Sequence, residues 1–199
     1  MQLFENIEVS GRILVPKRPS WVRKGLSDQN AVRYYNALTR FYIVETPVKR
    51  LSSLSVPLVS YGWKRPWAKP EYLNRHLKDA MSQSQALYSA ETRDTMEDAL
   101  SKAGLLDYVD ENNLQERIAI YNCERNQFMS TFYHVRNALC HGRFSFIKSR
   151  RTIWVVLEDV SSARKSDGED VVVLGARMIL KQTTLLTWQK LVSHGPNDA

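Results

Sequence analysis

The chain has 199 residues, of which 43% are hydrophobic and 25% are charged. This composition is ordinary for a globular protein and excludes global disorder as well as collagen-like and coiled-coil sequences. A chain of this length buries roughly 70% of its unfolded surface, so it needs no disulfide or metal to stay folded. The net charge of +7 favours a polyanionic partner without proving one.

Cysteine content and hydropathy exclude further classes. The two cysteines, Cys123 and Cys140, form no CxxC pair, which argues against a zinc ribbon and a disulfide scaffold. No apolar run approaches the roughly 18 residues that a membrane span needs, and residues 1–24 lack the apolar core of a signal peptide. We therefore expect a soluble, cytoplasmic protein of one domain, residues 1–199, without a membrane partner.

Prolines divide the chain, because six of the seven fall within the first 70 residues. We expect residues 1–70 to form an N-terminal addition to the helical core. It would contain a strand over residues 7–15, a helix over about residues 29–42 and an irregular stretch over residues 47–70. From residue 71 to 142 we expect a helical core. Helices are predicted over residues 71–82, after a proline, and over residues 92–103, before the helix-ending Gly104.

The strongest periodic segment predicts one helix of about 30 residues over residues 114–142. Seven apolar residues recur there at steps of 4, 3, 7, 4, 3 and 4 and form a single stripe: Leu114, Ile118, Tyr121, Phe128, Phe132, Val135 and Leu139. Gly142 is expected to end this helix as a left-handed cap. In such a continuous helix Cys123 and Cys140 lie about 25 Å apart and cannot form a disulfide.

After Gly142 the period changes to two. Strands are expected from Phe144 and Phe146 and over residues 152–157 and 171–180, with a flexible loop over residues 161–170. A closing amphipathic helix is predicted over about residues 183–193. The expected fold is thus mainly α, in the α+β class, with a helical core, a small antiparallel sheet over residues 143–199 and a final helix.

Common enzyme signatures are missing from the sequence. It contains no GxSxG elbow, no phosphate-binding GxxxxGK[ST] loop, no GxGxxG and no HExxH. His134 and His141 are seven residues apart, and no acidic residue between them completes a metal-binding set. We therefore expect neither a metal nor another cofactor.

The segment FYHVRNALCHGRF, residues 132–144, contains Arg136-Asn137-x-x-x-His141 directly before Gly142. It resembles the RNxxxH motif of the HEPN superfamily, which includes metal-independent endoribonucleases of toxin–antitoxin and phage-defence systems. The resemblance covers roughly residues 71–142. It implies a HEPN-like helical bundle, with Arg136, Asn137 and His141 as catalytic residues acting on RNA.

The chemistry of these residues supports the same interpretation. Cleavage of RNA without a metal needs a base that takes the 2′-OH proton, and histidine has a suitable unperturbed pKa. It also needs a fixed cation on the phosphate, which arginine supplies. Asn137 and His141 share a helix face, so the amide can orient the imidazole or bind a phosphate. Each residue also has a structural interpretation: His141 as a helix-end cation, Arg136 as a snorkelling side chain and Asn137 as a surface residue.

Arg136 and His141 diverge by about 140° around one helix, so a single subunit does not aim both at one point. The resemblance implies that the two side chains come together in a homodimer, in which two copies of the motif meet in one cleft. It also implies a possible antitoxin or defence-system partner protein.

Two further features are candidates for RNA binding. Residues 61–70 interleave aromatic and basic side chains that suit base stacking and phosphate contact: Trp63, Lys64, Arg65 and Trp67. Packing of these tryptophans on the core is the alternative. A basic turn and the residue after Gly142 can widen a phosphate-binding rim: Arg143, Lys148, Arg150 and Arg151. Solvated charges explain the turn equally well. Cys140 is expected to be a small buried apolar residue.

The sequence therefore favours a metal-independent endoribonuclease that acts as a toxin or antiphage defence effector. A catalytically silent module of the same type, which binds RNA, a nucleotide or a protein, is the alternative. A helical interaction subunit of a larger complex is a third possibility.

Overall fold

The computed structural model describes most of the chain, namely residues 8–9, 12–15, 29–48, 54–64, 70–81, 86–106, 109, 112–124, 126–164, 168 and 170–196. Its α-helices are α1 (Gln29–Thr39), α2 (Pro70–Asp79), α3 (Met96–Ala103), α4 (Gln127–Cys140) and α5 (Gln182–His194). Its strands are β1 (Glu8–Val9), β2 (Arg12–Val15), β3 (Leu87–Ala90), β4 (Arg117–Tyr121), β5 (Phe144–Ser149), β6 (Thr152–Arg164) and β7 (Asp170–Lys181). A π-helical turn, Arg40–Glu45, continues α1, and short 3-10 turns cover Leu58–Tyr61 and Arg93–Thr95.

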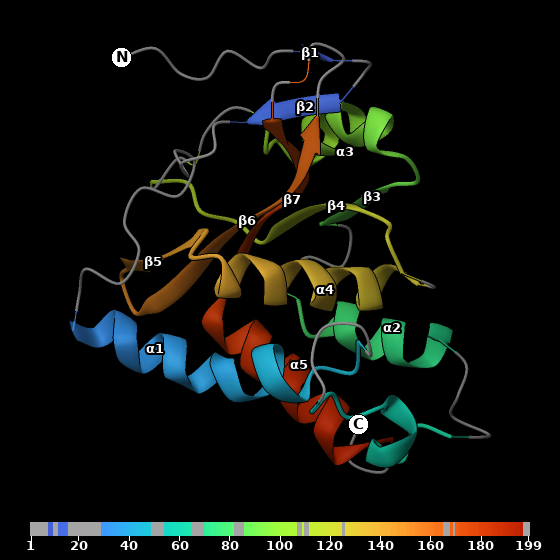
Figure 1. Ribbon diagram of the computed structural model, residues 1–199. Coiled ribbons are helices and arrows are strands. Elements are labelled where there is room, and N and C mark those ends of the chain that lie inside the picture. Colours follow the sequence, from blue (N-terminus) through green and yellow to red (C-terminus); the bar gives the residue numbers. More distant parts are fainter. Residues whose placement is uncertain are drawn as a thin grey trace.

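A mixed, strongly twisted sheet runs through the middle of the molecule (Figure 1). The long strands β6 and β7 pair antiparallel along almost their whole length. On its other edge β7 pairs with β4 and, further along, with the β2 end of the β1–β2 hairpin. The sheet is extended by β5 beside β6 and by β3, which is parallel to β4.

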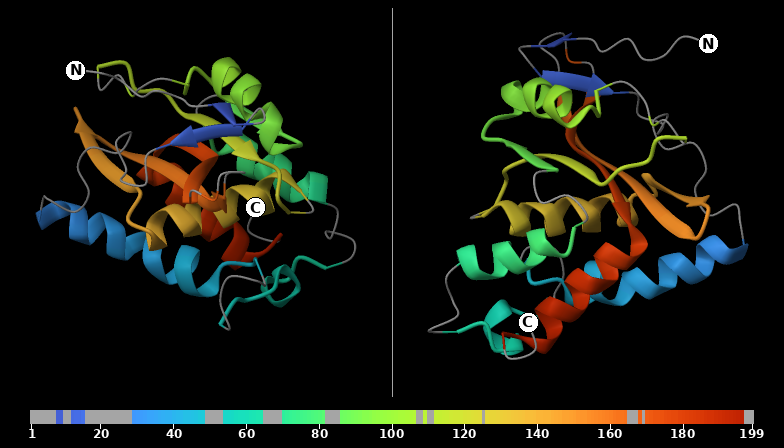
Figure 2. Two further views of the ribbon diagram at one scale, coloured as in Figure 1. Left: turned by 45° about the horizontal axis from the view of Figure 1, so that its top comes forward. Right: turned by 180° about the vertical axis from the view of Figure 1, so that it is seen from behind.

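The helices are divided between the two faces of this sheet. Four of them, α1, α2, α4 and α5, lie together on one side, whereas α3 lies on the other side near β2 (Figures 1 and 2). Alternate strand residues supply the two cores, as the two-residue period of a strand requires. On β7, Met178 and Leu180 face the four helices, while Ile179 faces α3.

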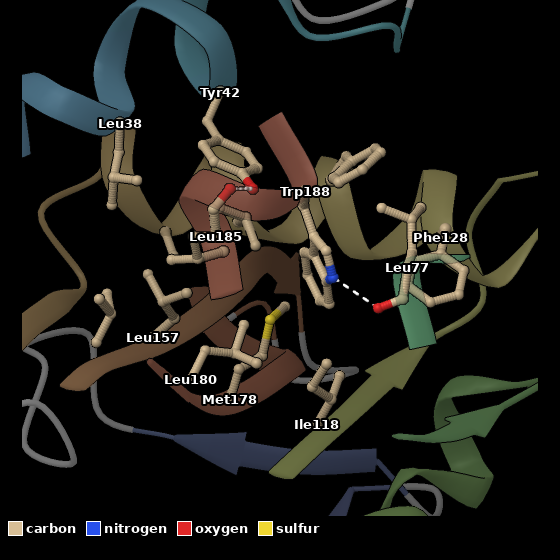
Figure 3. Packing of buried hydrophobic residues seen from close by; sticks show 14 of the residues in the cluster. Leu38, Tyr42, Leu77, Ile118, Phe128, Leu157, Met178, Leu180, Leu185 and Trp188 are labelled. Atoms are coloured by element: carbon tan, nitrogen blue, oxygen red, sulfur yellow. Dashed lines mark hydrogen bonds between the residues drawn. The ribbon is translucent and has the colours of Figure 1, made fainter. Parts of the chain in front are cut away.

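Two buried aromatic residues in the helical layer, Trp188 and Tyr42, form hydrogen bonds through their polar atoms. Trp188 of α5 is fully buried, and its Nε1 donates to the carbonyl oxygen of Leu77 at 2.7 Å (Figure 3). The hydroxyl of Tyr42 donates to the carbonyl oxygen of Leu185, also at 2.7 Å. Burial without a partner would cost a few kcal/mol per group, so these bonds fix how α1, α2 and α5 pack.

The expected fold class is wrong. The chain is not a mainly helical, HEPN-like bundle with a small antiparallel sheet, because the described residues form a seven-stranded mixed sheet with helices on both faces. Two strands of 13 and 12 residues, β6 and β7, form its centre. The parallel β3–β4 pair excludes a purely antiparallel arrangement.

The predicted 30-residue helix is the source of this error. Residues 117–121 form strand β4, and a new helix, α4, begins only at Gln127. The side chain of Asn126 caps it by accepting from the Met129 amide at 2.9 Å. Two residues of this strand, Ile118 and Tyr121, happen to lie at helical spacing from Phe128 and Phe132. This coincidence made the strand and the helix look like one continuous helix.

Other expectations have mixed outcomes. The helices before Gly104 and at the C-terminal end are confirmed as α3 and α5, and Gly104 adopts the left-handed conformation with φ of 63°. The strand expected over residues 7–15 is a pair, β1 and β2. Strand β3 was not predicted, and β6 extends to Arg164 through part of the expected loop. No helix in the described ranges is long and apolar enough to cross a membrane.

Candidate functional site

The C-terminal end of α4 carries the RNxxxH residues and has a well-defined cap. His141 is the last residue before Gly142, whose φ of 67° is the predicted left-handed conformation. The amide of Arg143 donates to the carbonyl oxygen of Ala138 at 2.9 Å, and that of His141 to Asn137 at 2.9 Å. The bond from Arg143 to Ala138, together with the left-handed Gly142, is typical of a Schellman motif, which holds the C-terminal end of the helix in one conformation.

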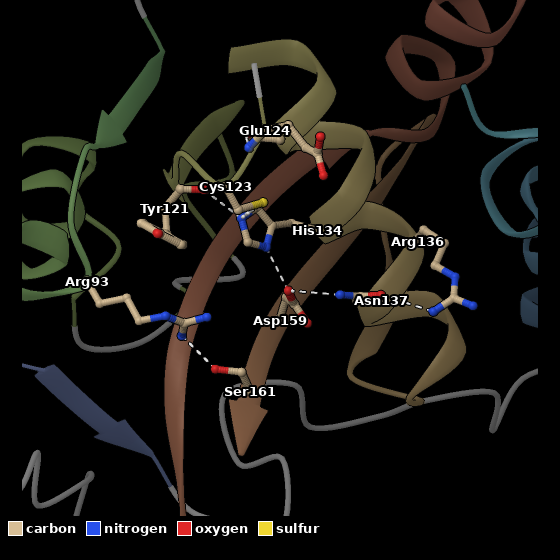
Figure 4. Close-up of polar contacts among 10 residues, drawn as sticks. Arg93, Tyr121, Cys123, Glu124, His134, Arg136, Asn137, Asp159 and Ser161 are labelled. Atoms are coloured by element: carbon tan, nitrogen blue, oxygen red, sulfur yellow. Dashed lines mark hydrogen bonds and ion pairs between the residues drawn. The ribbon is translucent and has the colours of Figure 1, made fainter. Parts of the chain in front are cut away.

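Asn137 points inward rather than along the surface. Only 9% of the residue is exposed, and its Nδ2 donates to Oδ2 of Asp159 on β6 at 3.5 Å. Its Oδ1 accepts from Nη1 of Arg136 at 3.1 Å (Figure 4). The structure therefore links Asn137 to Arg136, its neighbour in the chain, whereas sequence reasoning paired it with the His141 imidazole.

His141 lies at the exposed end of the helix. It is the C-cap residue, with φ of −95° and ψ of 7°, and the residue is exposed. Cys140 beside it is also exposed, which differs from the small buried residue expected there. The imidazole is thus accessible to a substrate.

Arg143 does not belong to a phosphate-binding rim, because its guanidinium is buried. Only 4% of Arg143 is exposed, and its Nη2 pairs with Oε1 of Glu158. Arg177 completes this network, with Nε donating to Oε2 of Glu158 at 3.1 Å and Nη1 donating to the carbonyl oxygen of Leu105 at 3.2 Å. Arg143 was predicted to contact RNA. In the structure it is a buried partner of Glu158 on β6.

The basic turn is a tight hairpin between β5 and β6, and its three cations are exposed. Lys148 lies near the end of β5, and Arg150 and Arg151 form the turn. Arg150 has φ of 55°, a conformation that costs a residue with a side chain about 1 kcal/mol and that glycine adopts freely. Strand β5, which connects the end of α4 to this hairpin tip, is about 17 Å long from Phe144 to Ser149.

The aromatic-basic stretch divides into a core residue and a surface residue. Trp63 is 4% exposed, and its Nε1 donates to the carbonyl oxygen of Val192 at 2.9 Å, so it packs in the core and offers no face for base stacking. This corrects its predicted role. Lys64 is exposed. Arg65 and Trp67 lie outside the described residues.

A buried ionic cluster behind the motif was not predicted. His134, one turn before Ala138 on α4, is 1% exposed, and its Nδ1 lies 2.6 Å from Oδ2 of Asp159. Its Nε2 lies 2.7 Å from the carbonyl oxygen of Tyr121 and 3.7 Å from Sγ of Cys123 (Figure 4). Asp159 therefore contacts both His134 and Asn137 from the sheet.

Electrostatics of this cluster keep the imidazole charged. Burial by itself lowers the pKa of His134, but the hydrogen bonds to Asp159 and Cys123 and the charges of these groups outweigh it and raise the pKa to about 10. Both ring nitrogens face oxygen acceptors, so both carry hydrogen. His134 is an imidazolium at neutral pH.

Gly175 makes the space for this cluster. The β6–β7 register shifts between Asp159 and Val160, and Gly175 on β7 is the residue left without a partner, as in a β-bulge. A Cβ at Gly175 would lie 3.3 Å from Cε1 of His134 and 3.6 Å from Oδ2 of Asp159. A bulge with a glycine thus lets α4 approach the sheet closely enough for the ion pair.

Sequence reasoning missed the cluster because its members come from three elements. The spacing of residues along one helix says nothing of Asp159, which lies 25 residues further on and belongs to a strand. The available signal was Asp159 itself, an acidic residue that follows the apolar run of β6. Among the described residues no group of three or more His, Cys, Asp or Glu side chains is arranged to hold a metal ion.

No family model matches the chain, and neither a curated protein nor a solved structure matches it. The assignment of a function therefore depends on the chemistry of these residues.

Proposed function

We propose that this protein is a metal-independent endoribonuclease whose site is the C-terminal end of α4. The proposal depends on the RNxxxH residues and their surroundings, and not on the helical-bundle fold that the sequence suggested. The observation that carries it is the anchored Arg136: its guanidinium is hydrogen-bonded to Asn137, and Asn137 is bonded to the buried Asp159. His141 is exposed at the end of the same helix.

The arrangement supplies the two groups that RNA cleavage needs. His141 takes the proton from a ribose 2′-OH, and the 2′ oxygen attacks the adjacent phosphorus. The bond from phosphorus to the 5′ oxygen breaks, which leaves a 2′,3′-cyclic phosphate and a 5′-OH end. Arg136 stabilises the negative charge that develops on the phosphate oxygens, and an arginine held in place does so without reorganisation during the reaction.

A dimer is part of the proposal. Met129, Tyr133, Arg136 and Cys140 follow one another along α4 at steps of four, three and four, so they share one face. Met129 and Tyr133 pack in part against the core of the same chain, Arg136 is half-buried and Cys140 is exposed, so a partner would contact the part of this face near the motif end of the helix. Two copies packed on this face would bring Arg136 of one subunit towards His141 of the other.

Exposed cations support binding of the RNA strand. Lys148, Arg150 and Arg151 form an exposed basic cluster at the tip of the β5–β6 hairpin, at the far end of β5 from the motif. A single-stranded RNA bound at the end of α4 that also follows β5, a strand about 17 Å long, would contact this cluster through its phosphates. The strained backbone of Arg150 is consistent with a functional demand for arginine at that position.

The direct test is incubation of the purified full chain with single-stranded RNA in excess EDTA. We expect cleavage to persist, with 5′-OH and cyclic-phosphate ends identified by mass spectrometry. Cleavage that EDTA abolishes would contradict the proposal, as would products with 5′-phosphate ends. RNA that stays intact but binds in a salt-sensitive way would instead identify the protein as a silent RNA-binding module.

A further inference from the structure

Strand β3 forms an edge of the sheet, and no described strand covers its outer side. The sheet order ends with β4 and then β3, and β3 lies at the margin of the sheet beside α3 (Figure 1). The carbonyl oxygens of Ala86 and Ala90 accept from amides of β4 and of the residue after it, at 2.7 and 2.8 Å. Backbone groups alternate between the two sides of a strand, so those of Leu87, Ser89 and Glu91 point away from β4. Another strand can bind to these groups.

A groove of about 430 Å³ follows this edge. It is lined by β3, by residues of α3 and by Gln127, the first residue of α4. On the α3 side the lining includes the buried Ala90 and Ala99, whose small side chains leave room for another side chain. On the α4 side Nε2 of Gln127 donates to Oγ of Ser89 at 3.1 Å and forms the opposite wall. A strand added beside β3 would therefore have a helix on each side.

The two ends of the groove carry opposite charges. After the short connection of residues 91–95, α3 runs back beside β3 (Figure 1). Glu91 and Asp98 therefore lie at the end of the groove where β3 finishes, and Lys102 lies one turn further along α3, towards the start of β3. All three side chains are exposed. The acidic end repels RNA phosphates, whereas a protein segment with a basic and an acidic residue at suitable spacing complements both ends.

We propose that β3 binds an extended segment of a partner protein, which joins the sheet as a further strand between α3 and α4. The segment runs antiparallel to β3, the more stable of the two pairings. A basic residue of the segment lies beside Glu91 and Asp98. An apolar residue packs on Ala99, and an acidic residue lies beside Lys102. The groove is about 20 Å from the motif end of α4, a helix of 14 residues, so the proposal is independent of the ribonuclease activity.

The alternation of side chains along β3 determines which partner residues enter the groove. Tyr88 and Ala90 belong to the core on the α3 side, whereas Leu87 packs with the other helices. Ser89 also faces that second side, where it meets Gln127. Partner residues opposite Tyr88 and Ala90 point towards α3, and those opposite Leu87 and Ser89 exchange backbone hydrogen bonds with them. The basic, apolar and acidic side chains must therefore occupy alternate positions, as in the sequence Lys-Thr-Val-Thr-Glu.

The peptide acetyl-Gly-Lys-Thr-Val-Thr-Glu-Gly-amide is the probe, titrated into the isotope-labelled full chain and followed by NMR. We expect the amide signals of Leu87 and Ser89 to shift, and their hydrogen exchange to slow about tenfold when about nine-tenths of the protein is bound. The amides of Tyr88 and Ala90 already face β4 and should change little. The control peptide has both threonines N-methylated. It lacks two of the donors that pair with β3 and should bind about tenfold more weakly.

A charge reversal in the protein tests the expected orientation. Lys102→Glu should weaken binding of the probe about fivefold, because the acidic end of the peptide then meets a like charge. Lys190→Glu makes the same change at an exposed position of α5, outside the groove, and should leave the affinity unchanged within about twofold. The Lys102→Glu chain should in turn prefer a peptide in which lysine replaces the glutamate.

Three results would overturn the proposal. The first is the absence of shifts at Leu87 and Ser89 with millimolar peptide, and the second is equal binding of the N-methylated peptide. The third is slow exchange of these two amides in the free chain, because the edge is then already covered. Protection that falls on dilution would identify a second copy as the cover, and protection that does not would identify another segment of the same chain. Equal affinity of the Lys102→Glu and Lys190→Glu chains would contradict the charge pairing.

Discussion

The carboxylate of Asp159 on β6 lies 2.6 Å from the imidazolium of His134 on α4, in the interior between sheet and helix. The same carboxylate oxygen accepts from Asn137, which in turn holds Arg136. A buried ion pair thus fixes the side of α4 from which the proposed phosphate-binding arginine extends. The position of Arg136 depends on the strand as well as on the helix.

Asn137 is therefore expected to act through Arg136. Asn137→Ala should lower the rate of RNA cleavage about tenfold, the loss expected for one hydrogen bond to a charged group. Arg136→Ala should cost more, and the double variant should be no slower than Arg136→Ala alone. Asn74→Ala on α2 is the matched control and should leave the rate unchanged. Additive losses in the double variant would show that Asn137 has a separate role.

The pKa of His134 predicts how stability depends on pH. Its folded value of about 10 lies above the ordinary value of 6.5, so its contribution is complete below about pH 6.5 and is lost as pH rises through 10. The free energy of unfolding should fall over this range by up to about 1.4 kcal/mol per pH unit. Urea unfolding at several pH values measures it. His134→Gln should remove this part of the slope, and an unchanged slope would contradict the assignment.

The buried network of Glu158 makes a second prediction about stability. Glu158→Gln leaves the guanidinium groups of Arg143 and Arg177 without their carboxylate, in a region where all three residues are at most 4% exposed. We expect a loss of about 3 kcal/mol or more in the free energy of unfolding. Glu45→Gln breaks the exposed pair with Arg40 and should cost less than about 1 kcal/mol. Equal losses in the two variants would show that the network is not buried in solution.

The sequence predicted single helices and their ends from neighbouring residues. The arrangement of the sheet depends on contacts between residues that are distant in the sequence. The caps at Gly104 and Gly142 and the pattern of α5 were readable because each depends on a few neighbouring residues. The extent of the sheet was not readable. Its parallel β3–β4 pair joins segments 31 residues apart, and β3 has no strong alternation of its own.

The site shows the same division. The motif residues were identified from spacing, whereas the orientation of Asn137 depends on Asp159, 22 residues away. The burial of Trp63 depends on Val192, which is 129 residues away, and composition could not separate this from a surface role. The burial of Arg143 likewise depends on Glu158, 15 residues away, so its place in the sequence beside Gly142 predicted an accessible cation.

The proposed dimer predicts complementation between inactive subunits. Because each cleft would combine Arg136 of one chain with His141 of the other, a mixture of Arg136→Ala and His141→Ala chains forms some clefts with both wild-type groups. We expect such a mixture to recover up to about a quarter of the wild-type cleavage rate if subunits exchange freely. A mixture that stays inactive, although mass spectrometry shows mixed dimers, would contradict a composite site.

The central claim, that His141 performs the proton transfer, is tested most directly by comparing two histidines at helix ends. His141 and His194 are both exposed at the C-terminal ends of their helices, α4 and α5. Single-turnover cleavage of RNA in EDTA, measured for His141→Ala and His194→Ala, should show a loss of about 100-fold or more for the first and none for the second. A folded His141→Ala protein that cleaves RNA as fast as the His194→Ala protein would contradict the claim.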